Sequence, residues 1–403
     1  MSSFRIPLML DQGGVAVLDD LDLAYFLRHS GASLPVRLEH LAARDAKGRA
    51  LPVQWLRRGE LSLVAGQRCG TLLVDAAASK TVDVFVQAGP QELPAVAQKE
   101  PHGNAVTIQD QKGSLHVTVD GKPFVTYRYN TKDPELPRPY FHPLLGPAGQ
   151  VITQLGEVPG KRVAHFHHTA LWIAHQNFAA QGDKPCDNWQ IGRPNSSKIE
   201  HVRFDSIQNG PMAGRFVERL HWLNVKGDRV LLEETRTVTI PRRAAASRVL
   251  DVEIQLRARA AAVTLLRTPY HLLAVRVVNA MLPAGGGVIT NSAGAQNPAD
   301  GAPADWIDIS GPLDKAWQGV ALFNHPGNIR QPTPCLQFSR QTIGLSPSHR
   351  EPLAIEAKQD LRLRYRVLVH AGNVKEGRVD AEYQAYRKPP QARIGPAERV
   401  PAT

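Results

Sequence analysis

Hydrophobic and polar residues alternate along much of the chain, and this two-residue period is typical of half-buried β-strands. In LRLRYRVLV, residues 361–369, the apolar side chains face one way, and Arg362, Arg364 and Arg366 face the other. The same alternation runs through TVDVFVQAG, HVRFDSI, RVLDVEIQLRA and GGGVITNS. We therefore expect strands to make up most of the ordered chain.

Turn signals join these runs into hairpins. In GSLHVTVDGKPFVTYRYN, two alternating runs flank Asp120-Gly121, a dipeptide that accepts the positive φ of a tight hairpin turn. GRFVERLHWLNVKGDRVLLEETRTVTI repeats the arrangement around Gly227-Asp228. Helical periodicity is scarce, and we expect helices only near LEHLAARDAKG and at RVDAEYQAYRK.

Many short strands with tight turns predict a large antiparallel β-sandwich. The polar, proline-bearing stretch QAGPQELPAVAQKEPHGNA has the composition of a linker. We therefore expect an N-terminal β-rich module at residues 1–97 and a main sandwich domain at residues 98–388, which holds the dense polar and aromatic clusters. The tail at residues 389–403 is predicted to be disordered.

The composition is that of a folded globular protein, because 42% of the 403 residues are hydrophobic and 21% are charged. The formal net charge of +11 is high, but the basic residues are scattered and their densest runs, PRRAAASR and LRLRYR, are short. An arginine row on a strand is more often a solvated face or the wall of an anion-binding cleft than a nucleic-acid site. We therefore expect no nucleic-acid partner.

The three cysteines and the N-terminal sequence indicate the cellular compartment in which the protein is expected. Cys69, Cys186 and Cys335 lie far apart and form no CxxC pair, which disfavours a thiolate zinc site and a disulfide framework. The N-terminal MSSFRIPLMLDQGG lacks the long apolar segment and small-residue cleavage site of a signal peptide. No window approaches the ~18 uninterrupted apolar residues of a membrane-spanning helix. These features predict a cytoplasmic protein that does not enter a membrane.

Two hairpin strands carry charged residues in otherwise apolar rows. In RVLLEETRTVTI, alternation puts Glu234 and Arg236 on the face of Val230, and in the partner strand it puts Glu218 beside Trp222. A carboxylate in an apolar layer is costly unless it is paired. Two interpretations stay open: a structural pair, such as Glu218 with Arg236, or the floor of a cleft with Glu234 as acid or base.

Two loops combine histidine with aromatic or amide residues. RPYFHPLLGPAGQVIT places Tyr140 and His142 before a turn, which suits a sugar site where rings stack on C–H faces and imidazole handles a hydroxyl proton. GVALFNHPGNIRQPTP places His325 and Asn328 after a strand end, where binding groups concentrate. The alternative for this second loop is an asparagine that caps its own turn.

The densest histidine cluster is RVAHFHHTALWIAH, which holds His165, His167, His168 and His175. As a strand, this segment would turn His165 and His167 to one face and His168 to the other. As a helix, it would stack His168, Trp172 and His175. Neither geometry presents all four imidazoles to one ion. A two-histidine metal site that takes its third ligand from elsewhere in the chain stays open.

Taken together, RPYFHPL, HxHHxxLW, HPxN and a closing RYRxxVHxG resemble one bacterial family, a domain of unknown function often labelled "methane oxygenase PmoA-like". The resemblance covers approximately residues 121–387. The family motif usually reads close to DHPHHRGLW, whereas this chain reads AHFHHTALW and is similar to a divergent member. Ala164 stands where the family has an acid that would orient an imidazole, and Thr169 where it has an arginine that would contact an anion.

The resemblance implies carbohydrate processing, because members of that family commonly occur among sugar-catabolism proteins. It does not imply methane oxidation, since the enzyme that oxidises methane is membrane-bound and this chain has no membrane segment. Trp189, in DNWQIG, resembles the tryptophan that follows the family's histidine motif.

We therefore predict a carbohydrate-processing enzyme on a sandwich like the supersandwich of sugar mutarotases. It would act on a saccharide or an oxidised (keto) sugar derivative. Histidine acid–base chemistry of the lyase, hydrolase or epimerase type would carry the reaction, since imidazole titrates near neutral pH. The candidate catalytic residues are His142, His165, His168, His325 and Glu234. The candidate substrate-binding residues are Tyr140, His167, Trp172, Trp189, Arg236 and Asn328.

No cofactor is expected at this site. The first alternative is a metal-dependent enzyme with a His-ligated divalent ion, and the second is a non-catalytic carbohydrate-binding protein. The expected partner is a small-molecule or oligosaccharide substrate, and self-association into a homo-oligomer is left open.

Overall fold

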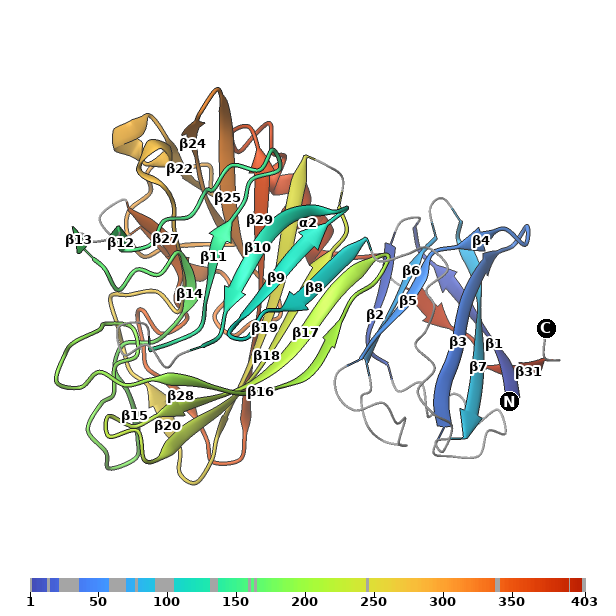
Figure 1. Cartoon of the computed structure of the whole chain (residues 1–403), viewed down its shortest axis with the longest axis horizontal. Helices are drawn as coiled ribbons and strands as arrows, with labels where there is room; N and C mark the ends of the chain where they lie inside the picture. The colour runs from blue at the N-terminus through green and yellow to red at the C-terminus, as the bar shows by residue number, and fades with distance from the viewer. Residues whose placement is uncertain are drawn as a thin grey trace. The chain divides into compact units, whose positions relative to one another are not determined.

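The computed structural model describes residues 2–12, 15–21, 36–57, 70–76, 79–90, 105–130, 137–158, 161–162, 165–243, 246–337, 341–390 and 392–400. The chain forms two compact units (Figure 1). The first comprises residues 1–106, 205–217 and 388–403, and the second comprises residues 107–204 and 218–387. Cys69, Ala164 and most of the expected linker lie outside the described residues.

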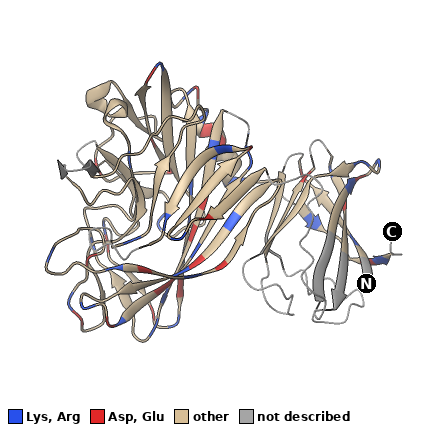
Figure 2. Ribbon diagram, viewed as in Figure 1, with Lys and Arg blue, Asp and Glu red and all other residues tan. Residues whose placement is uncertain are grey.

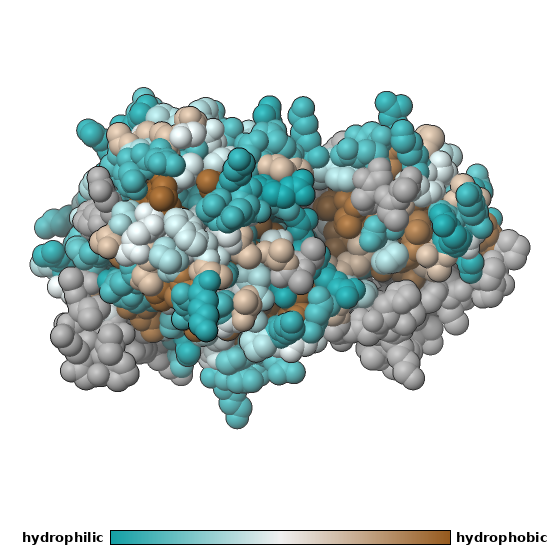
Figure 3. Space-filling model, turned by 90° about the horizontal axis from the view of Figure 1, so that it is seen from above, coloured by the Kyte–Doolittle hydropathy of each residue, from teal (hydrophilic) through white to brown (hydrophobic). Residues whose placement is uncertain are grey.

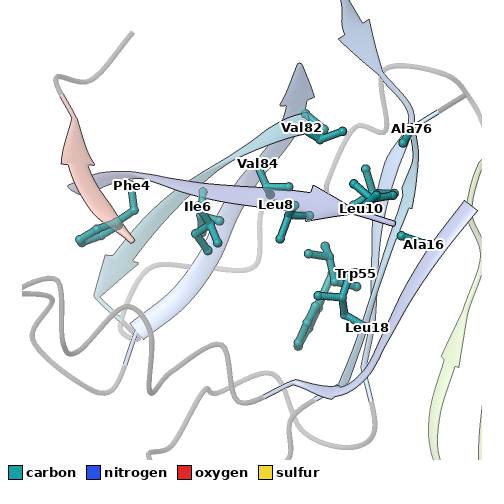
Figure 4. Close-up of a cluster of buried hydrophobic side chains, with 14 residues drawn as sticks. Phe4, Ile6, Leu8, Leu10, Ala16, Leu18, Trp55, Ala76, Val82 and Val84 are labelled. Atoms are coloured by element: carbon teal, nitrogen blue, oxygen red, sulfur yellow. The ribbon is translucent and has the colours of Figure 1, made fainter. Parts of the chain in front are cut away.

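The first unit is β-rich, as predicted, and its strands form two antiparallel sheets with the orders β30-β1-β7-β3-β4 and β2-β6-β5. Alternate side chains of β1 are buried in one core with Trp55 of β5 (Figure 4). The strands are β1 (Ser2–Leu10), β2 (Val15–Leu21), β3 (Val36–Asp45), β4 (Ala50–Leu51), β5 (Val53–Arg57), β6 (Gly70–Asp75), β7 (Thr81–Pro90), β30 (Ala392–Ile394) and β31 (Glu398–Val400).

Two parts of this unit differ from the sequence prediction. The tail after residue 389, for which we expected disorder, contains β30 and β31, and both pair antiparallel with β1. The helix expected near LEHLAARDAKG is instead strand β3, which pairs with β7. A register shift between Leu38 and His40 adds one residue to β3 and breaks strict alternation, which explains the helix-like spacing of its apolar residues.

Most of the strands of a nine-stranded and an eight-stranded sheet belong to the second unit. The nine-stranded sheet runs in the order β23 (Ala302–Ala304), β26 (Thr333–Leu336), β27 (Thr342–Leu345), β21 (Leu273–Arg276), β14 (Leu171–Ile173), β11 (Tyr140–Leu144), β10 (Lys122–Arg128), β9 (Ser114–Val119) and β8 (Val106–Asp110). The eight-stranded sheet runs in the order β16 (Ile199–Gln208), β17 (Ala213–Leu223), β18 (Val230–Pro241), β19 (Ser247–Ala258), β29 (Asp360–Ala371), β25 (Ala316–Asn324), β24 (Trp306–Leu313) and β22 (Val288–Asn291).

Smaller elements complete the second unit. The strands β15 (Phe178–Ala180), β20 (Val263–Leu265) and β28 (Leu353–Ile355) form a three-stranded sheet, and β12 (Glu157–Val158) pairs with β13 (Lys161–Arg162). The described part of the chain holds one α-helix, α2 (Val379–Arg387), where a helix was predicted, and two short 3₁₀ helices, η1 (Asn279–Met281) and η2 (Pro283–Gly285). None of the described helices is long and apolar enough to cross a membrane.

The two large sheets face each other across a buried layer, which confirms the predicted antiparallel β-sandwich. Tyr127 of β10 reaches from the nine-stranded sheet to Glu218 and Arg236 of the eight-stranded sheet, and all three side chains are buried. The side of the nine-stranded sheet that carries Tyr127 is its inner face. Phe141 pairs with Tyr127 and Leu171 pairs with Phe141, so these residues also lie on the inner face.

The hairpin turns form where the sequence predicted them. Asp120 and Gly121 have φ angles of 51° and 74° and join β9 to β10, as a tight turn with two left-handed residues requires. In the second hairpin, Gly227 has a φ of 75° in the connection between β17 and β18. Dipeptides that tolerate positive φ therefore located both turns.

Two arginines of the row on β29 pair with acidic residues of the neighbouring strand β19. Arg366 binds Asp251 through two hydrogen bonds of 2.6 and 2.8 Å, and Arg362 binds Glu253 at 2.7 Å. Figure 2 shows both charge signs interspersed over the strands of the larger unit. On the face drawn in Figure 3, hydrophilic side chains cover most of the described part of that unit, with hydrophobic residues in small separate patches. At Arg362 and Arg366 the row is therefore not a free basic surface.

Candidate functional site

Three of the four clustered histidines come together in a turn. His165, His167 and His168, which we call the histidine site, each offer one ring nitrogen, and these nitrogens all lie within 4.8 Å of one another. The backbone N–H of His168 donates to the carbonyl of His165 at 2.9 Å, and His165 has a φ of 58°. The segment is neither the strand nor the helix considered from the sequence, because this left-handed residue turns the chain before β14 begins.

The imidazole rings of His165 and His168 are stacked, and the ring of His167 stands nearly perpendicular to the ring of His168. The rings of His165 and His168 are nearly parallel, with centroids 5.0 Å apart, and the ring of His167 stands at 85° to that of His168 at 4.6 Å. His168 is buried, whereas His165 and His167 are partly exposed. The site therefore has a closed base and an accessible side.

The base of the site is the outer face of the nine-stranded sheet. Trp172 follows Leu171 in β14 and pairs with Tyr140 of β11, so both side chains lie on the face opposite Tyr127. The ring of His168 stacks on Trp172 with centroids 5.4 Å apart. The sheet thus supports the histidine turn from below and separates it from the sandwich interior.

Two arginines hold the backbone of the histidine turn. Arg138, which is 1% exposed, donates to the carbonyls of His167, Asn188 and Trp189, the last two at 2.9 and 3.1 Å. Arg276 of β21 donates to the carbonyl of His165 at 3.0 Å. Guanidinium groups that each reach one turn carbonyl fix the direction in which the turn presents its imidazoles.

An aromatic wall stands beside the histidines. The ring of Trp189 lies 5.0 Å from that of His167 and stacks on Tyr270 at 4.2 Å with an interplanar angle of 17°. Trp189 is buried and Tyr270 is partly exposed. The Tyr270 hydroxyl accepts a hydrogen bond of 3.2 Å from the side chain of Gln190. The wall therefore presents a ring and an amide near the accessible histidines.

Burial and positive neighbours keep the imidazoles of His167 and His168 neutral. Burial, and then the charge of Arg138, lowers the pKa of His167 to about 3. Burial also holds the pKa of His168 far below its ordinary value, and it lowers the pKa of the nearby His271 to about 3. Burial lowers the pKa of Arg138 to about 9. At pH 7, His167 and His168 can accept hydrogen bonds or coordinate an ion, but neither can donate a proton as an imidazolium.

His142 and His175 lie near this region without joining the three-histidine group. His142 follows Tyr140 by two residues in β11, shares a hydrogen bond of 3.1 Å with Thr153, and has its pKa lowered by burial to about 4. His175 is buried and shares a hydrogen bond of 2.7 Å with Ser348, while its backbone N–H donates to Asn188. The described contacts of both are those of side chains that fix loops to the sheet.

The structure places Glu234 and Arg236 on the other side of the nine-stranded sheet. Arg236 binds Glu234 at 2.7 Å and the Tyr127 hydroxyl at 2.9 Å, and Trp222 donates to Glu234 at 2.7 Å. Glu218 accepts from Tyr127 at 2.5 Å. Of the two interpretations, the geometry matches buried structural pairing, although Arg236 pairs with Glu234 rather than Glu218. We call these residues, together with His201, which binds Glu218 at 2.6 Å, the buried polar network.

His325 and Asn328 belong to a third region, next to α2. The ring of His325 lies 5.4 Å from that of Tyr386, and its Nδ1 accepts from the backbone of Gly327 at 2.9 Å. The Asn328 amide donates to Asn324 and to the carbonyl of Arg364, and its oxygen accepts from the Arg364 N–H. The side-chain amide of Asn328 thus anchors its loop to both β25 and β29.

A sequence model of the family of unknown function DUF6807 matches residues 114–384, a range that includes the whole histidine site. The chain belongs to this family. The resemblance to the family labelled methane oxygenase PmoA-like is therefore wrong, since nothing in the match connects the chain to PmoA. No curated protein matches the chain.

Two solved structures resemble the chain at low similarity. An alpha-mannosidase from Enterococcus faecalis V583 has a TM-score of 0.42 and 9% identity, over 98% of this chain and 46% of that protein. A protein in the glycosyl hydrolase family 38 from Enterococcus faecalis also has a TM-score of 0.42, with 8% identity over 98% of this chain and 47% of that one. The chain spans about half the length of both. Similarity at this level does not define a function.

Within the DUF6807 region, sequence reasoning missed four residues of the site. Arg138, Tyr270, His271 and Arg276 surround the histidines but were not among the candidates. One signal was present, because RTPYHLL places an aromatic residue and a histidine after a proline, as RPYFHPL does. The two arginines gave no local signal, since they act on the backbone of residues that are distant in the sequence.

Proposed function

We propose that the protein is a carbohydrate-processing enzyme that acts on a saccharide or an oxidised (keto) sugar derivative at the histidine site. The observation that carries this function is the convergence of the partly exposed His165 and His167 beside the stacked rings of Trp189 and Tyr270. A sugar ring needs an aromatic surface for its C–H face and polar groups for its hydroxyls, and both are present here.

Each group has a role that its exposure allows. Tyr270 is the exposed member of the ring pair, so it would contact the sugar, while the buried Trp189 holds Tyr270 in place. His165 and His167 would bind a hydroxyl or carbonyl oxygen. Trp172 and Tyr140, predicted as substrate contacts, are buried and would instead support His168 from the sheet.

The charge around the site favours an electron-rich substrate. The positive charges of Arg138, Arg276 and Arg193 all act on His167 and lower its pKa. The same field attracts a carboxylate or an enolate oxygen brought close to that ring. Sugar acids and keto sugars therefore fit better than neutral sugars.

Several reaction types share one first step that this site suits. The partly exposed His165 would accept a proton from the carbon beside a keto group, whose carbonyl makes that C–H more acidic. This proton transfer starts an elimination or an epimerisation. The negative charge then develops on the carbonyl oxygen, where the arginine field would stabilise it. Lyase and epimerase reactions on a keto sugar follow from this step, and a hydrolase would use the same contacts to hold its substrate.

A substrate panel tests this function. The purified chain is incubated with neutral, acidic and keto sugars and glycosides, and products are followed by mass spectrometry. We expect turnover of a keto or acidic member, with loss of activity in His167→Ala and Tyr270→Ala. His116→Ala is the matched control, because His116 lies in β9 of the same sheet and is bonded to Ser114. Binding without turnover of any sugar would favour the non-catalytic alternative.

A further inference from the structure

We propose that His165, His167 and His168 together bind one divalent transition-metal ion. Their three ring nitrogens already lie within 4.8 Å of one another. A tetrahedral zinc with Zn–N bonds of about 2.0–2.1 Å places its ligand nitrogens about 3.3 Å apart, so the cluster needs to contract only modestly. Rotation of the partly exposed His165 and His167 side chains supplies that movement without shifting the buried His168.

The backbone of the site is held in the conformation that brings the rings together. His165 has a left-handed φ of 58°, and the turn is closed by the hydrogen bond from His168 to the carbonyl of His165. Arg276 and Arg138 bind the carbonyls of His165 and His167. A non-glycine residue in the left-handed region is costly and persists where its surroundings impose it, which they do at this turn.

The donor atoms select the class of ion. All three are imidazole nitrogens, and no Asp, Glu or Cys side chain joins the group among the described residues. Nitrogen ligands suit zinc, copper, nickel and cobalt, whereas magnesium and calcium require oxygen ligands. Three protein ligands also leave one position of a tetrahedral ion open, which is the arrangement of catalytic rather than structural sites.

The arginines determine what fills the open position. Arg138 and Arg276 each bind a carbonyl of the turn, so their positive charges lie close to the ion. A dication beside two guanidinium groups is stabilised when its fourth ligand carries negative charge. We therefore expect hydroxide or an anionic substrate oxygen at that position. Binding of the ion by the three histidines does not depend on the identity of the substrate.

Metal binding can be measured without knowing the substrate. The untagged full chain is stripped with a chelator and titrated with Zn²⁺ by calorimetry and with Co²⁺ by absorption spectroscopy. We expect one ion per chain and the visible d–d bands of a tetrahedral Co²⁺ site, and no comparable binding of Mg²⁺ or Ca²⁺. His167→Ala and His165→Ala should each weaken binding by more than roughly 100-fold, since loss of even an outer-shell partner costs about 10–100-fold.

A matched control variant distinguishes ion binding at the histidine site from binding by other histidines of the chain. His116→Ala removes a histidine of the same sheet and should leave the stoichiometry and affinity unchanged. His165 and His167 are partly exposed, so their variants fold, whereas replacement of the buried His168 is not needed for the test. An absence of stoichiometric Zn²⁺ binding, or equal binding by the His165→Ala/His167→Ala double variant, would overturn the inference.

The metal site and the proposed function fail in different ways. If the chain binds one ion but turns over no sugar, the metal site stands and the carbohydrate function is wrong. If the chain binds no Zn²⁺ in the titration but turns over a sugar, and His167→Ala abolishes that turnover, the function stands and the metal site is wrong.

Discussion

The histidine site and the buried polar network lie on opposite faces of the nine-stranded sheet, and each gathers titratable side chains among aromatic rings. In the network, charged groups bind one another: Glu234 accepts from Arg236 and Trp222, and Glu218 accepts from Tyr127 and binds His201. In the histidine site, the arginines bind backbone carbonyls instead. The imidazoles are positioned by the turn that carries them.

This difference separates polar groups that hold the fold from polar groups available to a ligand. A buried carboxylate with matched donors has its hydrogen-bonding capacity used inside the protein, so it stabilises the sandwich when complete and destabilises it when broken. A partly exposed imidazole on a fixed turn can be reached by a ligand from solvent. Burial of charge alone therefore did not locate the site, although it made Glu234 and Arg236 look like candidates.

Breaking the network should produce the largest loss of stability. Arg236→Met leaves Glu234 buried without its cation, and removal of one partner from a buried pair costs about 3–5 kcal/mol. We expect urea unfolding to show a loss of this size. Arg242→Ala is the control, because the exposed Arg242 pairs with Asp120 at 2.8 Å and such surface pairs contribute about 0–1 kcal/mol. Equal losses in the two variants would contradict the contrast between the network and a surface pair.

The dependence of folding stability on pH should reveal the lowered pKa of the buried His175. Burial lowers the pKa of His175 to about 3. The unfolded chain then takes up this proton at higher pH than the folded chain, so the free energy of unfolding falls as pH drops from about 6.5 towards 3. For one such histidine, the loss between pH 7.5 and pH 5 is up to about 2 kcal/mol. His175→Gln, which keeps a polar group near Ser348, should reduce the loss measured by urea unfolding at the two pH values.

His370, whose pKa is shifted in the opposite direction, provides the control for that measurement. His370 is bound to Asp308 at 2.9 Å, and although burial opposes it, this pairing raises the pKa of His370. A raised pKa contributes stability below about pH 6.5 that is lost as the pH rises through the folded-state value. His370→Gln should therefore make the loss of stability on acidification steeper, not shallower. The same direction of change in both variants would contradict the assigned pKa shifts.

Removing a site imidazole should leave the fold almost unchanged. His167→Ala deletes a partly exposed ring whose packing is against Trp189, so we expect a loss below about 1 kcal/mol in urea unfolding. The same variant should lose the activity and the ion binding proposed above. A loss as large as that of Arg236→Met would mean that His167 serves the fold, and the distinction between the two faces would fail.

The smallest effect concerns the backbone beside the site. Ala170 is buried and has a φ of 60°, a conformation that costs an L-residue about 1–2 kcal/mol and glycine nothing. In Ala170→Gly this gain is offset by the lost methyl group and the entropy of glycine, so stability should change by less than about 0.5 kcal/mol. Ala274→Gly, in β21, has no such gain and should lose about 1–2 kcal/mol. Thermal or urea unfolding of the pair measures the strain at Ala170 directly.

The sequence predicted those parts of the fold that depend on neighbouring residues. The hairpin at Asp120-Gly121 formed as expected because alternation and positive-φ residues are local signals. The same alternation correctly placed Glu234 and Arg236 in a buried row. It failed at β3, where one inserted residue near His40 altered the pattern. The sequence therefore predicted the strand content and the antiparallel pairing, but it did not predict the β-bulge in β3.

The sequence predicted only part of the site, because the arrangement of the site residues depends on contacts between distant parts of the chain. The HxHH motif identified the histidines of the site, but the strand or helix considered from the sequence would have separated them. The turn that unites them is held by Arg138 and Arg276, which lie 29 and 111 residues from their partners. His325 and Glu234 shared the composition of a site without sharing its location. Residue type identified candidates, and tertiary contacts decided among them.

The pairing of β1 with β30 and β31 has a consequence for biosynthesis. β1 is made long before the two strands that cover one of its edges, at Ser3–Arg5 and Leu8–Leu10. Until residues 392–400 have been made, that edge of an alternating apolar strand presents open backbone donors and acceptors, which other chains can pair with. Completion of the first unit therefore waits until β30 and β31 have emerged from the ribosome, and a ribosome stalled before residue 392 would hold a chain with an exposed strand edge.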